Sequence, residues 1–415
     1  MPGLFAVLRP ISTPGLNAAQ SMSPSPATAF EVFRVFLRLG LTSFGGPIAH
    51  LGYFRTELVE RRGWVTESQF SQLLAICQFL PGPASSQLGF ALGLVRAGWL
   101  GAAAAFLAFT LPSALLLFGF AALAPALASS SGEAIIHGLK LVALVVVAGA
   151  VLGMGRKLCP DRPRQLIAAL AMAGVLMTET AWSQLAVVLA GAAAGWLSCR
   201  QVQPTEADAF PIRHGRGLAL TLAGLFALLL LTLPLVAGPS ASLMAVADAF
   251  YRAGALVFGG GHVVLPLLED SVVTPGWVSE EQFLAGYGAA QAIPGPMFAF
   301  SAYLGASIPA DAPALLVAGV ALLFMFLPGF LLVSAVLPVW ASVSRHAGMA
   351  RAIAGVNAAV VGLLAAALYD PIFTAAVTGA SDVAIAAVAF VLLAGWGLSP
   401  LWIVVGCVGA SLALT

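Results

Sequence analysis

Long apolar segments, separated by short polar stretches, follow one another along most of the chain. Most of them reach the roughly 20 residues that a helix needs to cross a bilayer. In chain order they cover residues 31–49, 68–95, 99–128, 135–154, 165–180, 182–198, 217–237, 245–267, 281–306, 313–339 and 350–369. Residues 371–415 are also apolar and hold two spans or three shorter pieces. The pattern predicts an all-α polytopic membrane protein with about 13 transmembrane segments, some of them broken helices.

The composition excludes several classes of protein. The chain has 415 residues, of which 60% are apolar and 8% are charged, and its formal net charge is +1. A soluble domain carries about 25% charged residues. A soluble enzyme, a disordered chain and a nucleic-acid binder are therefore excluded, and the lipid bilayer is the expected surrounding of most of the chain.

Loops rich in Lys and Arg predict the orientation of the segments. Such residues gather in 156–164, 200–216 and 345–351, and the span count brings all three loops to one side of the membrane. Basic loops mark the cytoplasmic side. We therefore expect a multi-pass protein of the plasma (inner) membrane with a cytoplasmic N-terminus.

The polar segment 50–67 disagrees with this orientation. It would face outside although it carries Arg55, Arg61 and Arg62. Two interpretations stay open. Either the three glutamates of the segment cancel its bias, or the segment is a hairpin folded into the protein.

The strongest pattern in the sequence is an internal repeat. Residues 63–70 (GWVTESQF) and 276–283 (GWVSEEQF) are identical at six of eight positions. Further matches in the same order lie on both sides of this stretch. They pair Arg38 with Arg252, Phe44-Gly45-Gly46 with Phe258-Gly259-Gly260, Gln78 with Gln291, Pro81-Gly82-Pro83 with Pro294-Gly295-Pro296, Leu111-Pro112 with Leu327-Pro328, and Lys140 with Asn357.

The repeat divides the chain into four parts. Residues 1–29 are expected to be a disordered tail, 30–205 the first repeat, 206–240 a connecting loop with a linker helix, and 241–415 the second repeat. Seven apolar segments precede the second copy. Because seven is odd, we expect the two homologous halves to have inverted topology, which is typical of secondary transporters.

Each copy carries the same backbone breaks. Phe-Gly-Gly occurs at 44–46 and 258–260, and Pro-Gly-Pro at 81–83 and 294–296. Proline and glycine at membrane depth free backbone groups that only protein or a polar cavity can satisfy. The half-helix that begins after a Pro-Gly-Pro also attracts anions through its N-terminal amides. In the first copy three hydrogen-bond donors follow the motif: Ser85, Ser86 and Gln87. A kink that serves packing alone is the alternative.

Charged residues inside apolar segments add candidates for binding. Arg252 can pair with Asp248 one turn away. Arg38 lies four residues from Arg34, so it needs an acidic partner such as Glu31 or an anionic substrate, for which the forked guanidinium is suited.

Other polar residues near the breaks have two interpretations each. His50 and His262 follow the glycine breaks and either couple protons or are hydrogen-bonded structural histidines. Lys140, matched by Asn357 in the second copy, is either a cationic ligand or an interface anchor.

Sequence patterns of enzymes and metal sites are absent. None of the GxSxG, HExxH, CxxC and Walker patterns occurs. The cysteines are too far apart in sequence for a metal or disulfide framework and are expected to be apolar fillers of helices: Cys77, Cys159, Cys199 and Cys407. We expect no enzyme, no cofactor and no metal, and an ATP-driven pump within this chain is excluded.

With these motifs the sequence resembles the chromate ion transporter (CHR) family. The resemblance rests on residues 36–50, 64–65, 78–89, 257–264 and 290–296, and it extends over residues 30–415. It is of the long-chain type, in which both halves are fused. The family's motif residues fall here on Arg38, Phe44, Gly45, Gly46, Gln78, Pro81, Gly82, Pro83, Gly259, Gly260, His262, Gln291, Pro294, Gly295 and Pro296.

The resemblance implies a secondary carrier that exports chromate and confers chromate resistance, with sulfate as a competing analogue. We expect the oxyanion to bind between the halves, held by Arg38, the half-helix after Pro83 and the donors Ser85, Ser86 and Gln87. Rocking of the inverted halves would alternate access. A carrier of sulfate or another anion, an anion channel, and a membrane enzyme or sensor remain as alternatives, and a homodimer is a possible assembly.

Overall fold

The computed structural model describes residues 28–43, 46–123, 130–177, 181–202, 210, 214–238, 240–257, 264–340 and 346–414. These residues form helices and their connections, and no strand occurs among them. Within this part of the chain, five helices are long and apolar enough to cross a membrane: Ala84–Leu123, Gly132–Leu158, Arg216–Val236, Ala314–Val339 and Ala347–Ala376. The all-helical membrane architecture predicted from the hydrophobic pattern is thus confirmed.

The first apolar segment folds as a helical hairpin. Helix α1 (Ala29–Thr42) begins at Thr28, whose side chain accepts a hydrogen bond from the Glu31 amide, and α2 (Gly46–Phe54) returns along it. The ring of Phe54 lies 5.5 Å from that of Phe36, so the two helices run antiparallel. The hydrophobic pattern predicts one segment over residues 31–49, but the described residues on either side of the Phe-Gly-Gly motif form two antiparallel helices. Residues 44–45 lie outside the described part.

A second hairpin follows in the first repeat. It consists of α3 (Glu67–Phe79) and the first part of α4 (Ala84–Leu123). The Arg96 guanidinium lies over the Trp64 ring at 5.5 Å, which brings the two ends of the hairpin together. Its tip is the Pro-Gly-Pro turn, where Gly82 has φ +124°. The sequence predicts an interruption within one continuous helix, but this left-handed glycine turns the chain back.

The long helix α4 contains a further reversal. Ala97 and Gly98 have non-helical dihedrals, and Gly98 has φ +65°. Gly93 and Gly101 then touch across the bend, because neither has a side chain to hold them apart. Helix α4 is therefore two antiparallel helices, and the second of them, residues 99–123, is the long apolar helix.

The second repeat has the same elements. Tyr303 of α12 donates a hydrogen bond to the Gln282 carbonyl of α11 at 2.9 Å, so this Pro-Gly-Pro segment is a hairpin too. Both copies start their second hairpin with a capping box, Thr66 with Gln69 and Ser279 with Gln282. The helices are α9 (Leu243–Leu256), α10 (Val264–Val272), α11 (Glu280–Ala292), α12 (Phe300–Ser307) and α13 (Ala314–Val336).

The remaining helices exchange partners between the repeats. Helix α15 of the second repeat packs on α6 and α7 of the first, and α5 of the first packs on α17 and α18 of the second. Glycines permit these close contacts: Gly355 meets Gly191 and Gly195, and Gly138 meets the Val408 backbone. The bounds are α5 Ser130–Leu158, α6 Arg162–Leu176, α7 Ala181–Ser198, α15 Ala347–Ala367, α17 Ala380–Phe390 and α18 Pro400–Leu414.

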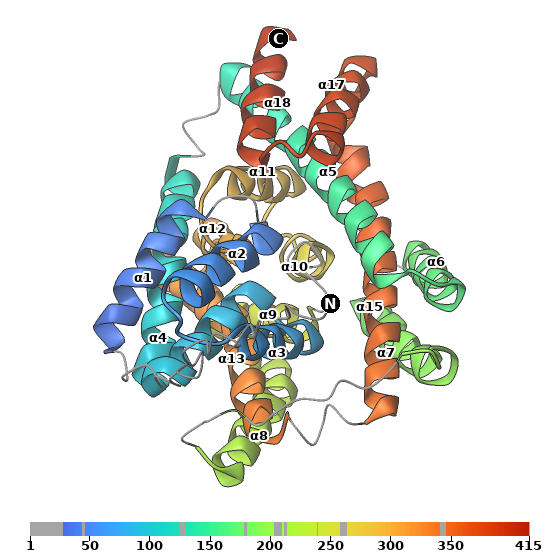
Figure 1. Ribbon diagram of the computed structural model, residues 1–415. Coiled ribbons are helices and arrows are strands. Elements are labelled where there is room, and N and C mark those ends of the chain that lie inside the picture. The colour runs from blue at the N-terminus through green and yellow to red at the C-terminus, as the bar shows by residue number, and fades with distance from the viewer. Residues whose placement is uncertain are drawn as a thin grey trace, which may run out of the picture.

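Two bodies result from this arrangement (Figure 1). The hairpin body contains the four hairpins, the second half of α4, α13 and the linker helix α8 (Arg216–Val236). The arm body contains α5, α6, α7, α15, α17 and α18. The bodies meet chiefly where α11 packs on α5, with Gly288 against the Leu139 backbone. The counterpart of α11, helix α3, makes no such packed contact with α15 in the part of the chain that the structure describes.

Candidate functional site: the meeting point of the hairpin tips

The hairpin tips of the two repeats contact each other inside the hairpin body. The Gly82 amide donates a hydrogen bond to the Val257 carbonyl at 2.6 Å, and the Gly295 amide donates to the Ser43 carbonyl at 2.9 Å. Ser43 and Val257 end α1 and α9, just before the Phe-Gly-Gly motifs. Each Pro-Gly-Pro tip is therefore bonded to the residue at the end of the first helix of the other repeat.

The proline-containing long helices complete this meeting point. A Cβ atom on Gly82 would lie 3.0 Å from the Gly329 Cα, and one on Gly295 would lie 2.8 Å from the Ser113 Oγ. Gly329 and Ser113 follow Pro328 and Pro112, so they are equivalent positions of the two copies. Both tip glycines have positive φ and no room for a side chain. This explains why the repeat keeps glycine between the two prolines.

Buried polar atoms gather at the tip of the first Pro-Gly-Pro hairpin. Gln87 is fully buried, and its Nε2 donates to the carbonyls of Pro81 at 2.8 Å and Gly329 at 3.1 Å. The Gln87 Oε1 and Ser86 Oγ atoms are buried and have no hydrogen-bond partner in the structure. Ser85 is buried beside them. Unsatisfied buried polar atoms next to a helix N-terminus are what a polar ligand would complete.

The second Pro-Gly-Pro tip is more apolar than the first. Gln291 is buried, and its Nε2 approaches the Met297 sulfur at 3.5 Å. Met297 and Phe298 occupy the first turn after the motif, where the first copy has serines. Gln78, the counterpart of Gln291, is half-buried in the last turn of α3. The meeting point is therefore two-fold in its backbone and asymmetric in its side chains.

His50 lies at the same place. It is fully buried, its Nε2 lies 3.2 Å from the Ser43 carbonyl, and its ring meets Phe109 edge-on. The Ser43 carbonyl thus accepts from both the His50 ring and the Gly295 amide when Nε2 carries the proton. The Nδ1 atom is buried without a partner. Through these contacts His50 stabilises the end of α1 at the tip.

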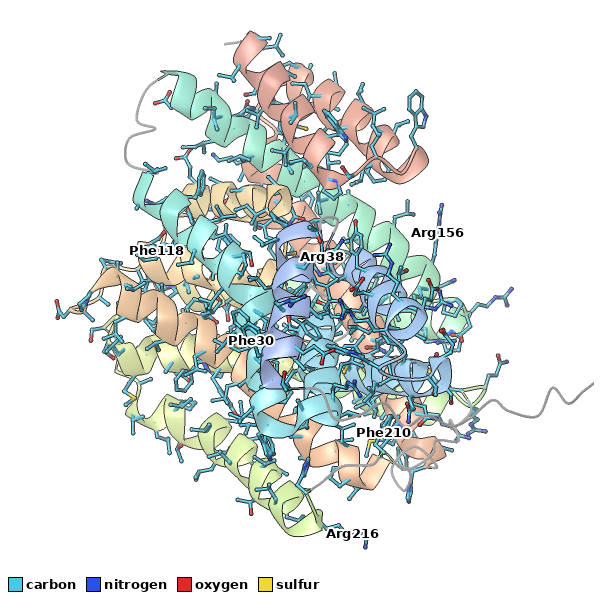
Figure 2. The ribbon with its side chains drawn as sticks, turned by 60° about the vertical axis from the view of Figure 1, so that its left-hand side comes forward. Phe30, Arg38, Phe118, Arg156, Phe210 and Arg216 are labelled. Atoms are coloured by element: carbon cyan, nitrogen blue, oxygen red, sulfur yellow. The ribbon has the colours of Figure 1, made fainter. Side chains whose placement is uncertain are left out.

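Arg38 lies away from the buried tips, on the exposed face of α1 (Figure 2). A groove of about 460 Å³ opens beside it between α1 and α2. Arg38, Leu39, Thr42, Gly52, Tyr53, Thr56, Glu57 and Arg61 line the groove. The sequence reasoning missed Thr42, Tyr53 and Thr56, because their spacing carries no motif and only the return of α2 brings them to Arg38.

Glu57 is the acidic residue of this groove. Arg62 donates to its carboxylate at 2.8 Å and Arg61 at 3.3 Å. Burial favours a higher pKa, but these hydrogen bonds and the charges of Arg62 and Arg38 hold the pKa of Glu57 below its ordinary value. Glu57 is therefore an ionised partner of the surrounding arginines, in the place that the sequence assigns to Glu31 as the partner of Arg38.

The other charged candidates lie apart from the tips. Arg252 pairs with Asp248 at 2.8 Å, which confirms the pairing expected from their spacing. Lys140 donates to Glu281 at 3.0 Å across the contact between α5 and α11. Asn357 lies on α15, and its Oδ1 is buried without a partner.

Several predicted residues cannot be placed. Gly46 begins α2, whereas Phe44, Gly45, Gly259, Gly260 and His262 lie outside the described residues.

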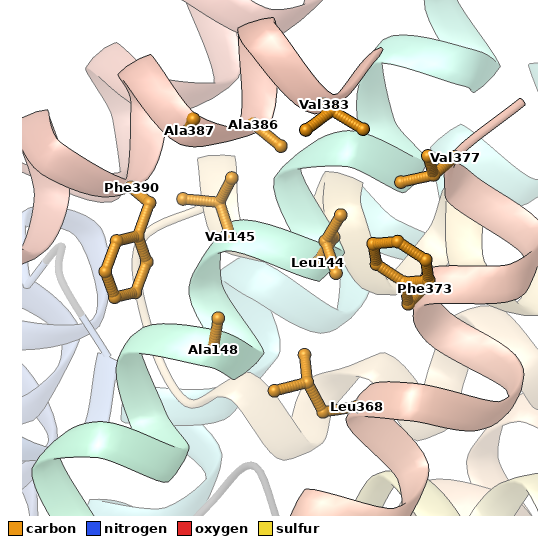
Figure 3. Close-up of a pocket in the computed structure, with 10 residues that line it drawn as sticks. All are labelled: Leu144, Val145, Ala148, Leu368, Phe373, Val377, Val383, Ala386, Ala387 and Phe390. Atoms are coloured by element: carbon orange, nitrogen blue, oxygen red, sulfur yellow. The ribbon is translucent and has the colours of Figure 1, made fainter. Parts of the chain in front are cut away.

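A second pocket has different chemistry. It has a volume of about 310 Å³ and lies between α5 and α17 (Figure 3). Ten apolar residues line it: Leu144, Val145, Ala148, Leu368, Phe373, Val377, Val383, Ala386, Ala387 and Phe390. Such a surface suits a lipid chain and offers nothing to an oxyanion. Among the residues that the structure describes, no group of three His, Cys, Asp or Glu side chains could hold a metal ion.

The comparison with protein families matches both repeats. The family model described as chromate transporter covers residues 30–196 and again 244–412. The chain belongs to the chromate transporter family. The resemblance found in the sequence motifs is thereby confirmed.

Curated relatives of this chromate transporter family member match over most of their length. A probable chromate transport protein of Synechococcus elongatus is 31% identical over 353 residues, which cover 81% of this chain and 83% of the relative. Chromate transport proteins of Cupriavidus metallidurans (30% identical; 86% of each chain) and Pseudomonas aeruginosa (29%; 85% of this chain and 83% of the relative) are similar too. No solved structure matches the chain.

Proposed function

We propose that the protein is a secondary active transporter that exports chromate across the plasma membrane and so confers chromate resistance. The observation that carries this proposal is the pair of reciprocal hydrogen bonds between hairpin tips, Gly82 to Val257 and Gly295 to Ser43. Broken helices that meet in the protein interior form the substrate sites of secondary transporters. Family membership and the named relatives support chromate as the substrate.

The hairpins suggest a membrane topology. A hairpin returns to the side from which it enters, so nine of the helices that the structure describes would cross fully: the second half of α4, then α5, α6, α7, α8, α13, α15, α17 and α18. Five of these precede the second repeat, and because five is odd the repeats would be inverted, as the sequence predicts. This number differs from the 13 segments counted from hydrophobicity. That count treated each of the four hairpins as a segment that crosses the membrane.

The charge distribution supports this topology. With hairpins returning to their side, 55–62 falls on the same side as the basic loops 156–164, 200–216 and 345–351. The conflict over 50–67 then disappears. Acidic residues gather on the opposite side: Glu133, Glu269, Asp270, Glu280 and Glu281. The positive-inside rule makes the basic side cytoplasmic.

The proposed substrate site is the tip of the α3–α4 hairpin. An oxyanion there would accept hydrogen bonds from the first-turn amides of α4 and from Ser86, with the amide of Gln87 beside it. Gln87 also bonds to the Gly329 carbonyl of the other repeat, so the site touches both repeats. Moving two negative charges outward across 100 mV, inside negative, releases about 4.6 kcal/mol.

Alternating access would come from movement of the hairpin body against the arm body. The exchange of α5 and α15 ties the repeats together, so the repeats themselves are poor candidates for separate rocking halves. In this structure α11 is packed on α5, whereas α3 has no comparable contact with α15 in the described residues. In the proposed topology, this conformation is closed outward and open toward the cytoplasm.

Transport into everted membrane vesicles tests the function. Vesicles from cells with this chain, energised by respiration, should accumulate labelled chromate saturably, and sulfate should compete. Control vesicles without the chain should not accumulate it. If the vesicles concentrate sulfate but leave chromate outside, the protein is a carrier of another anion. A bilayer conductance without exchange of trapped substrate would make it a channel.

Two variants test the site. Ser86→Ala should lower the maximal rate at least tenfold, since it removes a hydrogen bond of about 1.5–3 kcal/mol to a charged ligand. Gln87→Ala should also lower the rate, because it removes the hydrogen bond that joins the tip to the Gly329 carbonyl of the other repeat. Ser198→Ala is the control, because Ser198 is exposed on α7 and its hydroxyl donates to the Ala194 carbonyl one turn back. Unchanged rates in both tip variants would place the substrate elsewhere.

A further inference from the structure

The groove beside α1 lies at the protein surface, close in sequence to one of the hairpin tips. Arg61 lines it from the turn that continues α2. Arg38 and Thr42 line it from α1, and Thr42 directly precedes the tip residue Ser43, whose carbonyl bonds to the second-repeat tip. Polar side chains thus line a surface groove that adjoins a tip residue.

Arg38 is the candidate ligand-binding cation of this groove. Within the described part of the chain its guanidinium makes no hydrogen bond and no ion pair, although it is exposed to the groove. Glu57 is already engaged by Arg61 and Arg62. Three arginines therefore surround one carboxylate, and the excess charge is positive.

The equivalent place in the second repeat has the opposite balance. Arg252, the counterpart of Arg38, is paired with Asp248. Asp270, which aligns with Glu57, lies close enough for its charge to interact with Arg252. The first repeat carries arginine at the position of Asp248, namely Arg34. Among the described residues of these two hairpins, an arginine without a hydrogen-bonded carboxylate therefore lies beside the hairpin whose base would face the cytoplasm, whereas its counterpart Arg252 is paired.

We propose that this groove is a separate anion-binding site at the cytoplasmic entrance, which takes a doubly charged oxyanion before it reaches the tips. The inference rests on the proposed function, because it assigns the groove to the path of the transported ion. The forked guanidinium of Arg38 would bind two oxygens of the anion, and Thr56 lines the groove from the turn that continues α2. Positive charge in a cleft raises the local concentration of an anion and the rate of its capture.

Transport kinetics separate an entrance site from the transport site. In everted vesicles, Arg38→Gln should raise the KM for chromate about tenfold and leave the maximal rate within about twofold. Arg38→Lys should keep part of the affinity, because it keeps the charge and loses the fork. The matched control is Arg34→Gln, one turn away on the exposed face of α1 but outside the groove lining. A lost maximal rate with unchanged KM would overturn the proposal and place Arg38 in the transport site.

Direct binding adds a readout that does not depend on transport. Purified protein in detergent should bind labelled sulfate, Arg38→Gln should weaken that binding about tenfold, and Gln87→Ala should leave the groove component in place. If the wild-type protein binds sulfate through Arg38 but moves no chromate, the proposed function fails while the anion site stands. If neither KM nor sulfate binding responds to Arg38→Gln, the anion site itself is refuted.

The phosphate of an anionic lipid headgroup is an oxyanion that Arg38 would bind in the same way as the free ion. A separate experiment therefore distinguishes the lipid from the free ion. The protein is reconstituted in phosphatidylcholine alone and with added phosphatidylglycerol. An entrance site for the free ion predicts the same KM ratio between Arg38→Gln and wild type in both membranes. A ratio that falls to one in phosphatidylcholine alone would assign the groove to the lipid and overturn the proposal.

Discussion

At the scale of single residues, the two tip glycines are constrained in both their backbone and their surroundings. Gly82 and Gly295 combine a positive φ with contacts that leave no space for a methyl group. Their amides also make the reciprocal bonds between the repeats. Glycine is required here for its backbone and for the close approach of a second chain segment.

Substitution of Gly82 tests this constraint. Gly82→Ala should lower both the thermal midpoint and transport, because a Cβ there would lie 3.0 Å from the Gly329 backbone in addition to the cost of positive φ. Gly63→Ala is the matched control, since Gly63 also has positive φ (+56°) but no atom within 4 Å of the place that a methyl group would take. The control should lose only the roughly 1 kcal/mol of backbone strain. Equal midpoints in detergent for the two variants would contradict the packing argument.

Glu57 gives a prediction with a sign in pH. Its pKa lies below the ordinary value, so the stability that it contributes is present at neutral pH and is lost as pH falls through the folded pKa. Glu57→Gln should therefore cost about 1 kcal/mol near pH 7. The difference from wild type should vanish when both are unfolded by denaturant at pH below this pKa. A difference that stays constant with pH would indicate a packing effect of the substitution.

At the scale of elements, the sequence predicted where the helices break but not how the chain continues. The Pro-Gly-Pro at 81–83 and 294–296 correctly located the interruptions. An interrupted span and a hairpin have the same hydrophobic pattern, because periodicity records which residues are apolar and not the direction of the chain after a turn. The contact between Trp64 and Arg96 distinguishes the two, and it joins residues 32 positions apart.

The candidate site shows the same limit. Ser85, Ser86 and Gln87 were found because they follow a motif, and the structure buries all three at the tip. Arg38 was grouped with them because it also lies in an apolar segment. Which face of α1 packs on α4 decides that Arg38 is exposed, and this depends on long-range packing that the spacing of Arg34 and Arg38 does not encode.

At the scale of the whole molecule, an ion pair between Lys140 and Glu281 lies at the contact between the two bodies. Lys140 of α5 binds Glu281 of α11 on the side where the bodies are packed, and their counterparts in the other copy, Asn357 and Ser68, carry no charge. The two repeats therefore differ in how firmly they hold the bodies together. The ion pair favours the conformation in which α11 rests on α5.

A charge exchange tests whether Lys140 is an anchor or a ligand of the anion. Lys140→Glu alone places two like charges at the contact and should slow transport several-fold. The double variant, Lys140→Glu with Glu281→Lys, restores the pair and should recover most of the rate. Uptake into everted vesicles measures both. If the double variant stays as slow as the single one, Lys140 acts by binding the anion and the anchor role is wrong.

The exchange of α5 and α15 has a consequence for synthesis of the chain. Helix α5 leaves the ribosome long before α17 and α18, the helices on which it packs. Its packing face therefore stays without these partners in the membrane until the C-terminal residues are inserted. Each half of the molecule thus supplies helices that complete the packing of the other half. A gene divided in the 206–240 linker should therefore yield two polypeptides that are unstable singly and rebuild the transporter when co-expressed, and neither repeat should be able to serve as an independent unit of evolution without a second copy beside it.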